Sequence, residues 1–204
     1  MKKLAAFAFC CLPTLVLAND YDDWYQTELK NAEKITGFKF ANYNTSVYKG
    51  KKAALNKKDG FVRAFRTRIG DAHQEGVITF AGKYITTSWG CGTQCVSGAM
   101  IDKSTGKVYG ALSTAAGVID DENIHPTQTC EMLTDGITGD AEQLFKNNSR
   151  LMIVKVTCNA YHNIDTPYES ATVIYHVLEW QEKNKKFKWL ADKAIKVPTS
   201  QLYN

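Results

Sequence analysis

The first 18 residues constrain the fold most, because they decide which cysteines are available to form disulfides. Two lysines precede an apolar run from Leu4 to Leu17, and the chain turns sharply polar at Asn19. This order of basic, apolar, small and polar segments is typical of a cleavable secretory leader. We expect cleavage after Ala18 and a single secreted β-rich domain at 19–204, located in the bacterial periplasm or, alternatively, outside the cell.

Two other interpretations of this leader are less favoured. The apolar run is shorter than the roughly 20 residues that a helix needs to cross a bilayer, so we expect no membrane span after cleavage. A lipoprotein would need a small residue before Cys10, and Phe9 stands there.

Cleavage leaves four of the six cysteines: Cys91, Cys95, Cys130 and Cys158. An even number in an exported chain implies disulfides, and four cysteines allow three connectivities. We favour Cys91–Cys95 with Cys130–Cys158, and a bridge from Cys91 or Cys95 to Cys158 is the alternative. Cys91 and Cys95 have a spacing that zinc ligands allow, but Cys130 and Cys158 form no matching pair and oxidation competes in this compartment. A thiol oxidoreductase motif normally has two intervening residues, and here there are three. We therefore expect no metal and no cofactor.

Composition adds two further expectations. Without the leader the chain keeps 186 of its 204 residues, and its net charge falls from +4 to +2 because two lysines leave. That length suits one domain with its own hydrophobic core. The small positive charge indicates no nucleic-acid partner, and it says nothing of oligomeric state.

Residue patterns predict a mainly β fold, with α+β as the alternative. Apolar residues at helical spacing over 22–35 predict a short N-terminal helix. Alternation predicts an edge strand over 38–48, and β-forming residues predict a strand over 77–89. Apolar residues at both parities predict a central strand over 151–158. The segment 61–69 fits a helix or a strand equally well.

Two hairpins complete the expected fold, a single compact antiparallel sheet or sandwich. The first covers 96–112, where Asp102 starts a turn and Gly106 ends it at positive φ. The second covers 171–190. Between them, 113–148 is expected to form a long excursion with one short helix near 141–145, and the tail from Lys193 is expected to be loosely ordered.

Three motifs resemble a group of small, uncharacterised, exported bacterial proteins. They are Phe-Ala-Gly-x-Tyr from Phe80, Trp-Gly-Cys-Gly-Thr-x-Cys from Trp89, and Asp-x-x-Thr-Gly-Lys-Val from Asp102. The resemblance implies a compact β-rich fold and an envelope location, and it implies no activity. The chain departs from the group at Lys83, where a histidine is common, and in having Cys130 and Cys158.

Candidate functional residues lie in two segments. The cysteine-flanked loop could present outward backbone N–H groups and an aromatic anchor to a partner, and its candidate binding residues are Trp89, Gly90, Gly92, Thr93 and Gln94. The alternative is that Trp89 covers the core. A carboxylate cluster including Asp121 precedes His125, and these two residues are weak candidates for acid–base catalysis, since consecutive acids usually form a solvated turn.

These observations favour a non-enzymatic binding module of the periplasm. Its partner would be an envelope or extracellular protein, and one concrete form is an inhibitor or immunity protein against a cell-wall-active enzyme or toxin. The alternatives are an envelope hydrolase that uses the acidic loop with His125, and a structural protein of envelope assembly.

Overall fold

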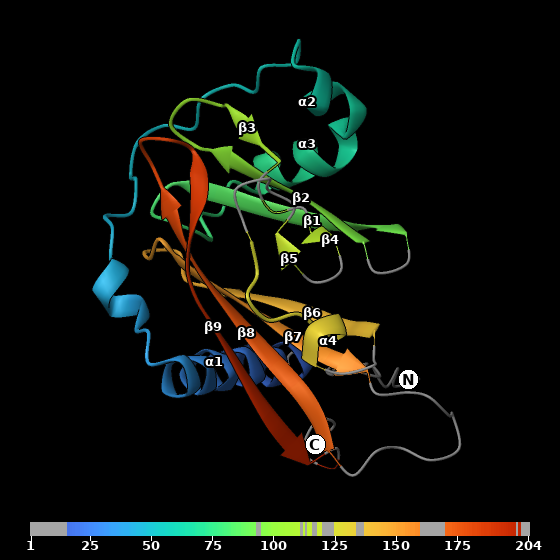
Figure 1. Cartoon of the computed structure of the whole chain (residues 1–204). Coiled ribbons are helices and arrows are strands. Elements are labelled where there is room, and N and C mark those ends of the chain that lie inside the picture. Colours follow the sequence, from blue (N-terminus) through green and yellow to red (C-terminus); the bar gives the residue numbers. More distant parts are fainter. Residues whose placement is uncertain are drawn as a thin grey trace, which may run out of the picture.

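The chain folds into two antiparallel β-sheets covered by helices, which confirms the mainly β expectation (Figure 1). The structure is a computed structural model, and it describes residues 16–92, 95–110, 112, 114–115, 118–119, 125–133, 137–159, 170–198 and 200. Most of the leader, Thr93, Gln94 and Asp121 lie outside these described residues.

The first sheet contains the predicted hairpin that follows the motif at Trp89. Its strands are β1 (Tyr84–Gly92), β2 (Cys95–Asp102), β3 (Val108–Tyr109), β4 (Thr114–Ala115) and β5 (Val118–Ile119). They lie in the order β1-β2-β4-β5, and β3 also pairs with β2. The turn matches its prediction, since the Asp102 carboxylate accepts the Ser104 N–H at 2.9 Å and Gly106 has a φ of 73°.

The second sheet contains β6 (Ile137–Phe145), β7 (Leu151–Asn159), β8 (Ser170–Gln181) and β9 (Lys186–Pro198), in that spatial order. β7 is the predicted central strand, and β8 with β9 is the predicted closing hairpin. The tail is more ordered than expected, because β9 pairs with β8 as far as Pro198.

Each sheet has one face toward the other sheet and one face toward helices. α1 (Val16–Thr36) packs on the outer face of the second sheet, where Leu29 and Ala32 meet residues such as Ile153 and Val177. α2 (Gly60–Ala64) and α3 (Arg66–Glu75) cover the outer face of the first sheet. Between the sheets lies an aromatic-rich core that includes Phe80, Tyr84, Trp180 and Phe187. None of the helices in the described part of the chain combines the length and apolar character needed to cross a bilayer.

The disulfide between Cys130 and Cys158 confirms one predicted pairing. It joins α4 (Cys130–Leu133) to β7, with 5.3 Å between the two Cα atoms. Cys91 is also disulfide-bonded, while the side chain of Cys95, its predicted partner, lies outside the described residues.

Two predicted elements are wrong, and tertiary contacts explain both. The segment 38–48 forms a short 3₁₀ helix, η1 (Phe40–Tyr43), because Phe40 is buried against α1 and its N–H donates to Glu33 Oε1 at 2.7 Å. The predicted helix at 141–145 is the end of β6, where Leu144 and Phe145 face opposite sides of the sheet and pair with β7.

The ambiguous segment 61–69 is helical. The Asp59 side chain accepts the N–H groups of Phe61 and Val62 and so caps α2 at its start. β1 begins at Tyr84, later than predicted, because residues 81–83 form a tight turn. Gly82 in that turn has a φ of 78°, and an added Cβ would lie 2.4 Å from the carbonyl oxygen of Ser46, so the two backbone segments approach closely.

Candidate functional site

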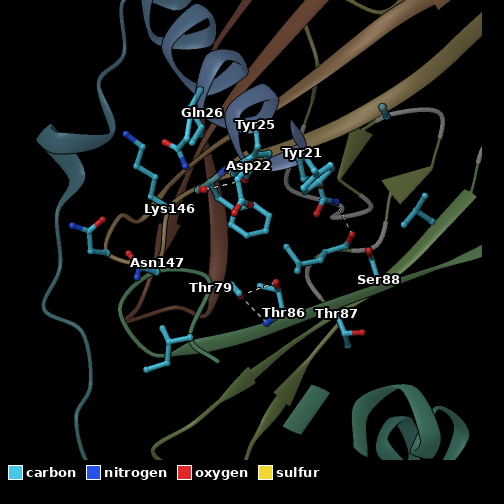
Figure 2. A pocket seen from close by; sticks show the side chains of 18 residues that line it. Tyr21, Asp22, Tyr25, Gln26, Thr79, Thr86, Thr87, Ser88, Lys146 and Asn147 are labelled. Carbon is cyan, nitrogen blue, oxygen red and sulfur yellow. Dashed lines mark hydrogen bonds between the residues drawn. The ribbon is translucent and has the colours of Figure 1, made fainter. Parts of the chain in front are cut away.

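A cleft of about 920 Å³ opens where α1, β1 and the end of β6 meet. Figure 2 shows Tyr21, Asp22, Tyr25 and Gln26 reaching into it from α1, with threonine and serine side chains on the opposite wall. The full lining is Tyr21, Asp22, Tyr25, Gln26, Leu29, Ile78, Thr79, Thr86, Thr87, Ser88, Val96, Leu112, Ala141, Gln143, Phe145, Lys146, Asn147 and Asn148. We call this set the cleft below.

The cleft is unusual because polar residues occupy core-facing positions around it. Side chains two residues apart share one face of a strand. Thr86 and Ser88 therefore share the face of Tyr84, which is fully buried between the sheets. On β6, Gln143 shares the face of Phe145, which packs against the same core. A packed sandwich interior would have apolar residues at such positions, so this end of the space between the sheets is lined by groups that can hydrogen-bond to a polar ligand.

Internal hydrogen bonds hold several of these side chains in place. Thr79 Oγ1 lies 2.8 Å from Thr86 Oγ1 and accepts the Thr86 N–H at 3.0 Å. Gln143 Nε2 donates to the carbonyl oxygen of Leu112 at 3.0 Å. A wall whose rotamers are already fixed loses little side-chain entropy when a ligand binds.

Tyr25 closes the edge of β6 beside the cleft. Its hydroxyl donates to the Phe145 carbonyl oxygen at 3.0 Å and accepts the Phe145 N–H at 3.0 Å. Burial raises the pKa of Tyr25, which outweighs the opposing effect of the hydrogen bond to Phe145. The phenol is therefore protonated at neutral pH and keeps both hydrogen bonds.

The sequence-predicted binding loop lies at the end of the β1–β2 hairpin. Gly90, Cys91 and Gly92 are exposed, whereas Trp89 is half-buried, with its ring centroid 4.7 Å from that of Phe65. The Trp89 ring thus packs toward α2 and α3. Among the candidate residues that the structure describes, the glycines offer main-chain groups to solvent.

The weak catalytic candidates are not brought to the cleft. His125 is exposed and is not among the cleft residues, and Asp121 lies outside the described residues. Across the described part of the chain, no group of three histidine, cysteine, aspartate or glutamate side chains could hold a metal ion.

A buried histidine–aspartate pair lies on the hairpin of β8 and β9. His176 Nδ1 is 2.7 Å from Asp192 Oδ1, and both side chains are almost fully buried. Asp192 Oδ2 accepts the N–H groups of Thr127 and Gln128 at 2.8 and 3.0 Å. The pair therefore anchors the segment before α4. The sequence placed His176 on a strand but gave no sign of its partner.

A network of charged groups surrounds Glu182, in the turn between β8 and β9. Lys83 Nζ lies 3.0 Å from Asp102 Oδ2 and 2.6 Å from Glu182 Oε1, so one ammonium bridges the two sheets. Burial lowers the pKa of Lys83, but hydrogen bonds to Glu182 and Asp102 outweigh this and raise it. Lys83, where the resembling group often has histidine, serves here as a structural cation.

Comparison with known proteins found no relative. No family model matches the chain, no curated protein matches it, and no solved structure matches it. The resemblance to the exported bacterial group stays a prediction.

Two sequence signals point to the cleft in hindsight. Tyr21 and Tyr25 lie four residues apart on α1, on the same side of the helix. The run Thr86-Thr87-Ser88 interrupts a β-strand with consecutive hydroxyl residues. Neither signal reveals which element faces which, and the cleft depends on that arrangement.

Proposed function

We propose that the chain is an exported, non-enzymatic binding module whose ligand lies in the cleft. The observation that carries this proposal is the set of polar side chains at core-facing positions around an open volume of about 920 Å³. Small-ligand and peptide sites are concave, mix apolar walls with a few placed polar groups, and usually have volumes of roughly 300–1,000 Å³. The cleft has these properties.

The chemistry of the wall favours recognition over hydrolysis. Most of the polar lining is neutral hydroxyl and amide, which can both donate and accept hydrogen bonds. Asp22 and Lys146 are the charged lining residues, and they come from separate elements. The His125 side chain proposed for the hydrolase alternative lies elsewhere.

The partner we propose is a protein of the envelope. Its concrete form is a cell-wall-active enzyme or a toxin, for which this chain would act as inhibitor or immunity protein in the periplasm, or alternatively outside the cell. This is supported by the continuity of the surface, since Ser88 lines the cleft and the exposed main chain of Gly90 and Gly92 follows directly.

The test uses the mature chain, residues 19–204, as bait in envelope extract and as an inhibitor in peptidoglycan hydrolase assays. The cleft variant is Asp22→Ala/Gln26→Ala, and the matched control on the same helix is Lys30→Ala/Lys34→Ala, whose residues are exposed and outside the cleft. We expect the cleft variant to bind its captured partner about tenfold more weakly, equivalent to about 1.4 kcal/mol, and the control to bind normally. Equal binding by both variants, or no capture and no inhibition by the wild type, would overturn the proposal.

A further inference from the structure

The outer edge of β1 is hydrogen-bonded only over its first part. Within the described residues β1 pairs with β2 on one side, and on the other side the Thr79 N–H donates to the Tyr84 carbonyl oxygen at 2.9 Å. Thr79 Oγ1 then accepts the Thr86 N–H at 3.0 Å. These bonds show that Tyr84 and Thr86 direct their main-chain groups away from β2.

The next part of this edge has no partner among the residues that the structure describes. In an antiparallel pair, the N–H and C=O of one residue point to the same side, and the side alternates along the strand. The carbonyl of Thr86 and both main-chain groups of Ser88 therefore point outward. No described residue hydrogen-bonds to these three groups. Ser88 is exposed and lines the cleft, so the open edge and the cleft are adjacent.

Up to Gly90, where a bulge begins, the described part of this edge also lacks the usual protection against strand pairing. Proteins block exposed edges with lysine, proline or covering groups. β9, the far edge of the second sheet, has four lysines and ends at Pro198. β6 is capped where Tyr25 bonds both main-chain groups of Phe145. By contrast, residues 86–92 contain no charged residue and no proline.

We propose that this edge binds an extended peptide segment of the partner protein by strand addition. This proposal rests on the proposed function, in which the cleft is the binding site. It adds the kind of partner segment that the site would bind. An added strand would exchange main-chain hydrogen bonds with Thr86 and Ser88, and alternate side chains would face opposite sides. Those on the side of Ser88 enter the polar cleft, and those on the side of Thr87 lie beside Trp89.

The recognised segment is therefore an extended stretch in which polar and apolar residues alternate. Polar side chains meet the hydroxyl and amide groups of the cleft. Apolar side chains meet the aromatic cluster formed by Trp89 with Phe61 and Phe65, whose rings lie within 6.5 Å of Trp89. Main-chain pairing supplies affinity and this alternation supplies selectivity.

The experiment begins with a phage-displayed library of random heptapeptides panned on the mature chain, followed by synthetic copies of the recovered sequences. Two substitutions of Ser88 distinguish the main-chain contribution to peptide binding from the side-chain contribution. Ser88→Ala keeps the outward N–H, whereas Ser88→Pro removes it and spares the β1–β2 ladder, because that N–H does not face β2. We expect Ser88→Pro to bind about tenfold more weakly than Ser88→Ala, because both variants lose the cleft hydroxyl and only Ser88→Pro also loses the outward N–H.

A second measurement keeps the test valid if Ser88→Pro fails to fold. In the wild type, the Ser88 amide should exchange rapidly with solvent and become protected when the peptide is added, while Thr87, which faces β2, is protected throughout. N-methylation of a peptide residue removes its N–H. Methylating every second residue should weaken binding only when the methylated residues are those whose N–H groups face β1.

Several results would overturn strand addition. They are failure to recover any peptide, equal binding to both Ser88 variants in folded protein, no added protection at Ser88, and pairing of β1 with a second copy of this chain, detected as a dimer by sedimentation. If the Asp22/Gln26 variant loses its partner while Ser88→Pro retains it, the cleft remains the binding site and its ligand, such as a glycan, binds through side chains alone.

Discussion

The hydroxyl of Tyr84 donates a 2.7 Å hydrogen bond to Oε2 of Glu182 and so joins the first sheet to the turn between β8 and β9. The same carboxylate accepts the indole N–H of Trp180 at 3.1 Å and pairs with Lys83 and Lys185. Because Tyr84 and Trp180 belong to the core between the sheets, this one carboxylate links the two sheets at one end of that core.

Stability should fall in acid as this carboxylate is protonated. Burial alone would raise the pKa of Glu182, but hydrogen bonds from Lys185, Lys83, Tyr84 and Trp180 outweigh burial and lower the pKa from 4.5 to about 2. A group with a lowered folded-state pKa stabilises the fold above its unfolded-state pKa, and this contribution is lost as the pH falls through the folded-state value. We therefore expect the contribution of Glu182 to be complete above about pH 5 and to disappear between about pH 4.5 and 2.

Glu182→Gln tests this directly by urea unfolding at pH 7, 4.5 and 3. Since Glu182 is 42% exposed, solvent screening limits the expected loss at pH 7 to about 1 kcal/mol. The difference between wild type and variant should shrink toward pH 2. Glu75→Gln, at an exposed position on α3, is the control and should show no such convergence. A Glu182→Gln penalty that stays constant with pH would contradict the prediction.

Removal of the disulfide between Cys130 and Cys158 should destabilise the whole domain. The two cysteines are 28 residues apart, and closing a loop of that size stabilises by about 3–4 kcal/mol in the chain-entropy model. Cys130→Ser/Cys158→Ser should lose about this free energy of unfolding, measured in urea without reductant. Reductant should destabilise the wild type at least as much as the double substitution does, because it also breaks the disulfide of Cys91, which the variant keeps. A loss below about 1 kcal/mol would show that α4 is held by other contacts.

The sequence predicted those elements whose signal is local. The hairpin turn at Asp102 and Gly106 depends on one side-chain acceptor and one positive φ, and both are found. The central strand at 151–158 depends on a run of apolar residues on both faces, and helices and the other sheet bury both faces of β7. Such features need little knowledge of the rest of the chain.

The elements that were predicted wrongly depend on contacts with distant parts of the chain. Alternation at 38–48 looked like a strand, but burial of Phe40 against α1 bends the chain into η1. The segment 141–145 looked helical, yet pairing with a distant strand makes it β6. The cleft was missed for the same reason, because its walls come from α1, β1 and β6, and their juxtaposition is set by packing between sheets.

Gly82→Ala should be far more costly than the same change at Gly37. Both glycines have a φ of 78°, so an alanine at either position adopts a left-handed conformation that costs about 1–2 kcal/mol. Around Gly37 no heavy atom lies within 4 Å of an added Cβ, whereas at Gly82 the Ser46 carbonyl oxygen would be 2.4 Å away. We expect Gly37→Ala to lose only the backbone cost and Gly82→Ala to lose about 3 kcal/mol or more in thermal or urea unfolding. Equal losses would mean that the 45–46 segment moves away freely.

Tyr25→Phe should leave the edge of β6 at Phe145 without its hydrogen-bond partner, while the aromatic ring still lines the cleft. The substitution removes only the hydroxyl that bonds both main-chain groups of Phe145, leaving those groups unpaired and half-buried. Loss of such a pairing costs about 1–3 kcal/mol, and the Phe145 amide should exchange with solvent more rapidly in the variant. Tyr21→Phe is the matched control, because Tyr21 lies one helical turn earlier on α1 and is 64% exposed. The control should change neither stability nor exchange at Phe145. Unchanged exchange at Phe145 in Tyr25→Phe would show that the β6 edge is protected by α1 packing, and the contrast between β6 and the open edge of β1 would then need another explanation.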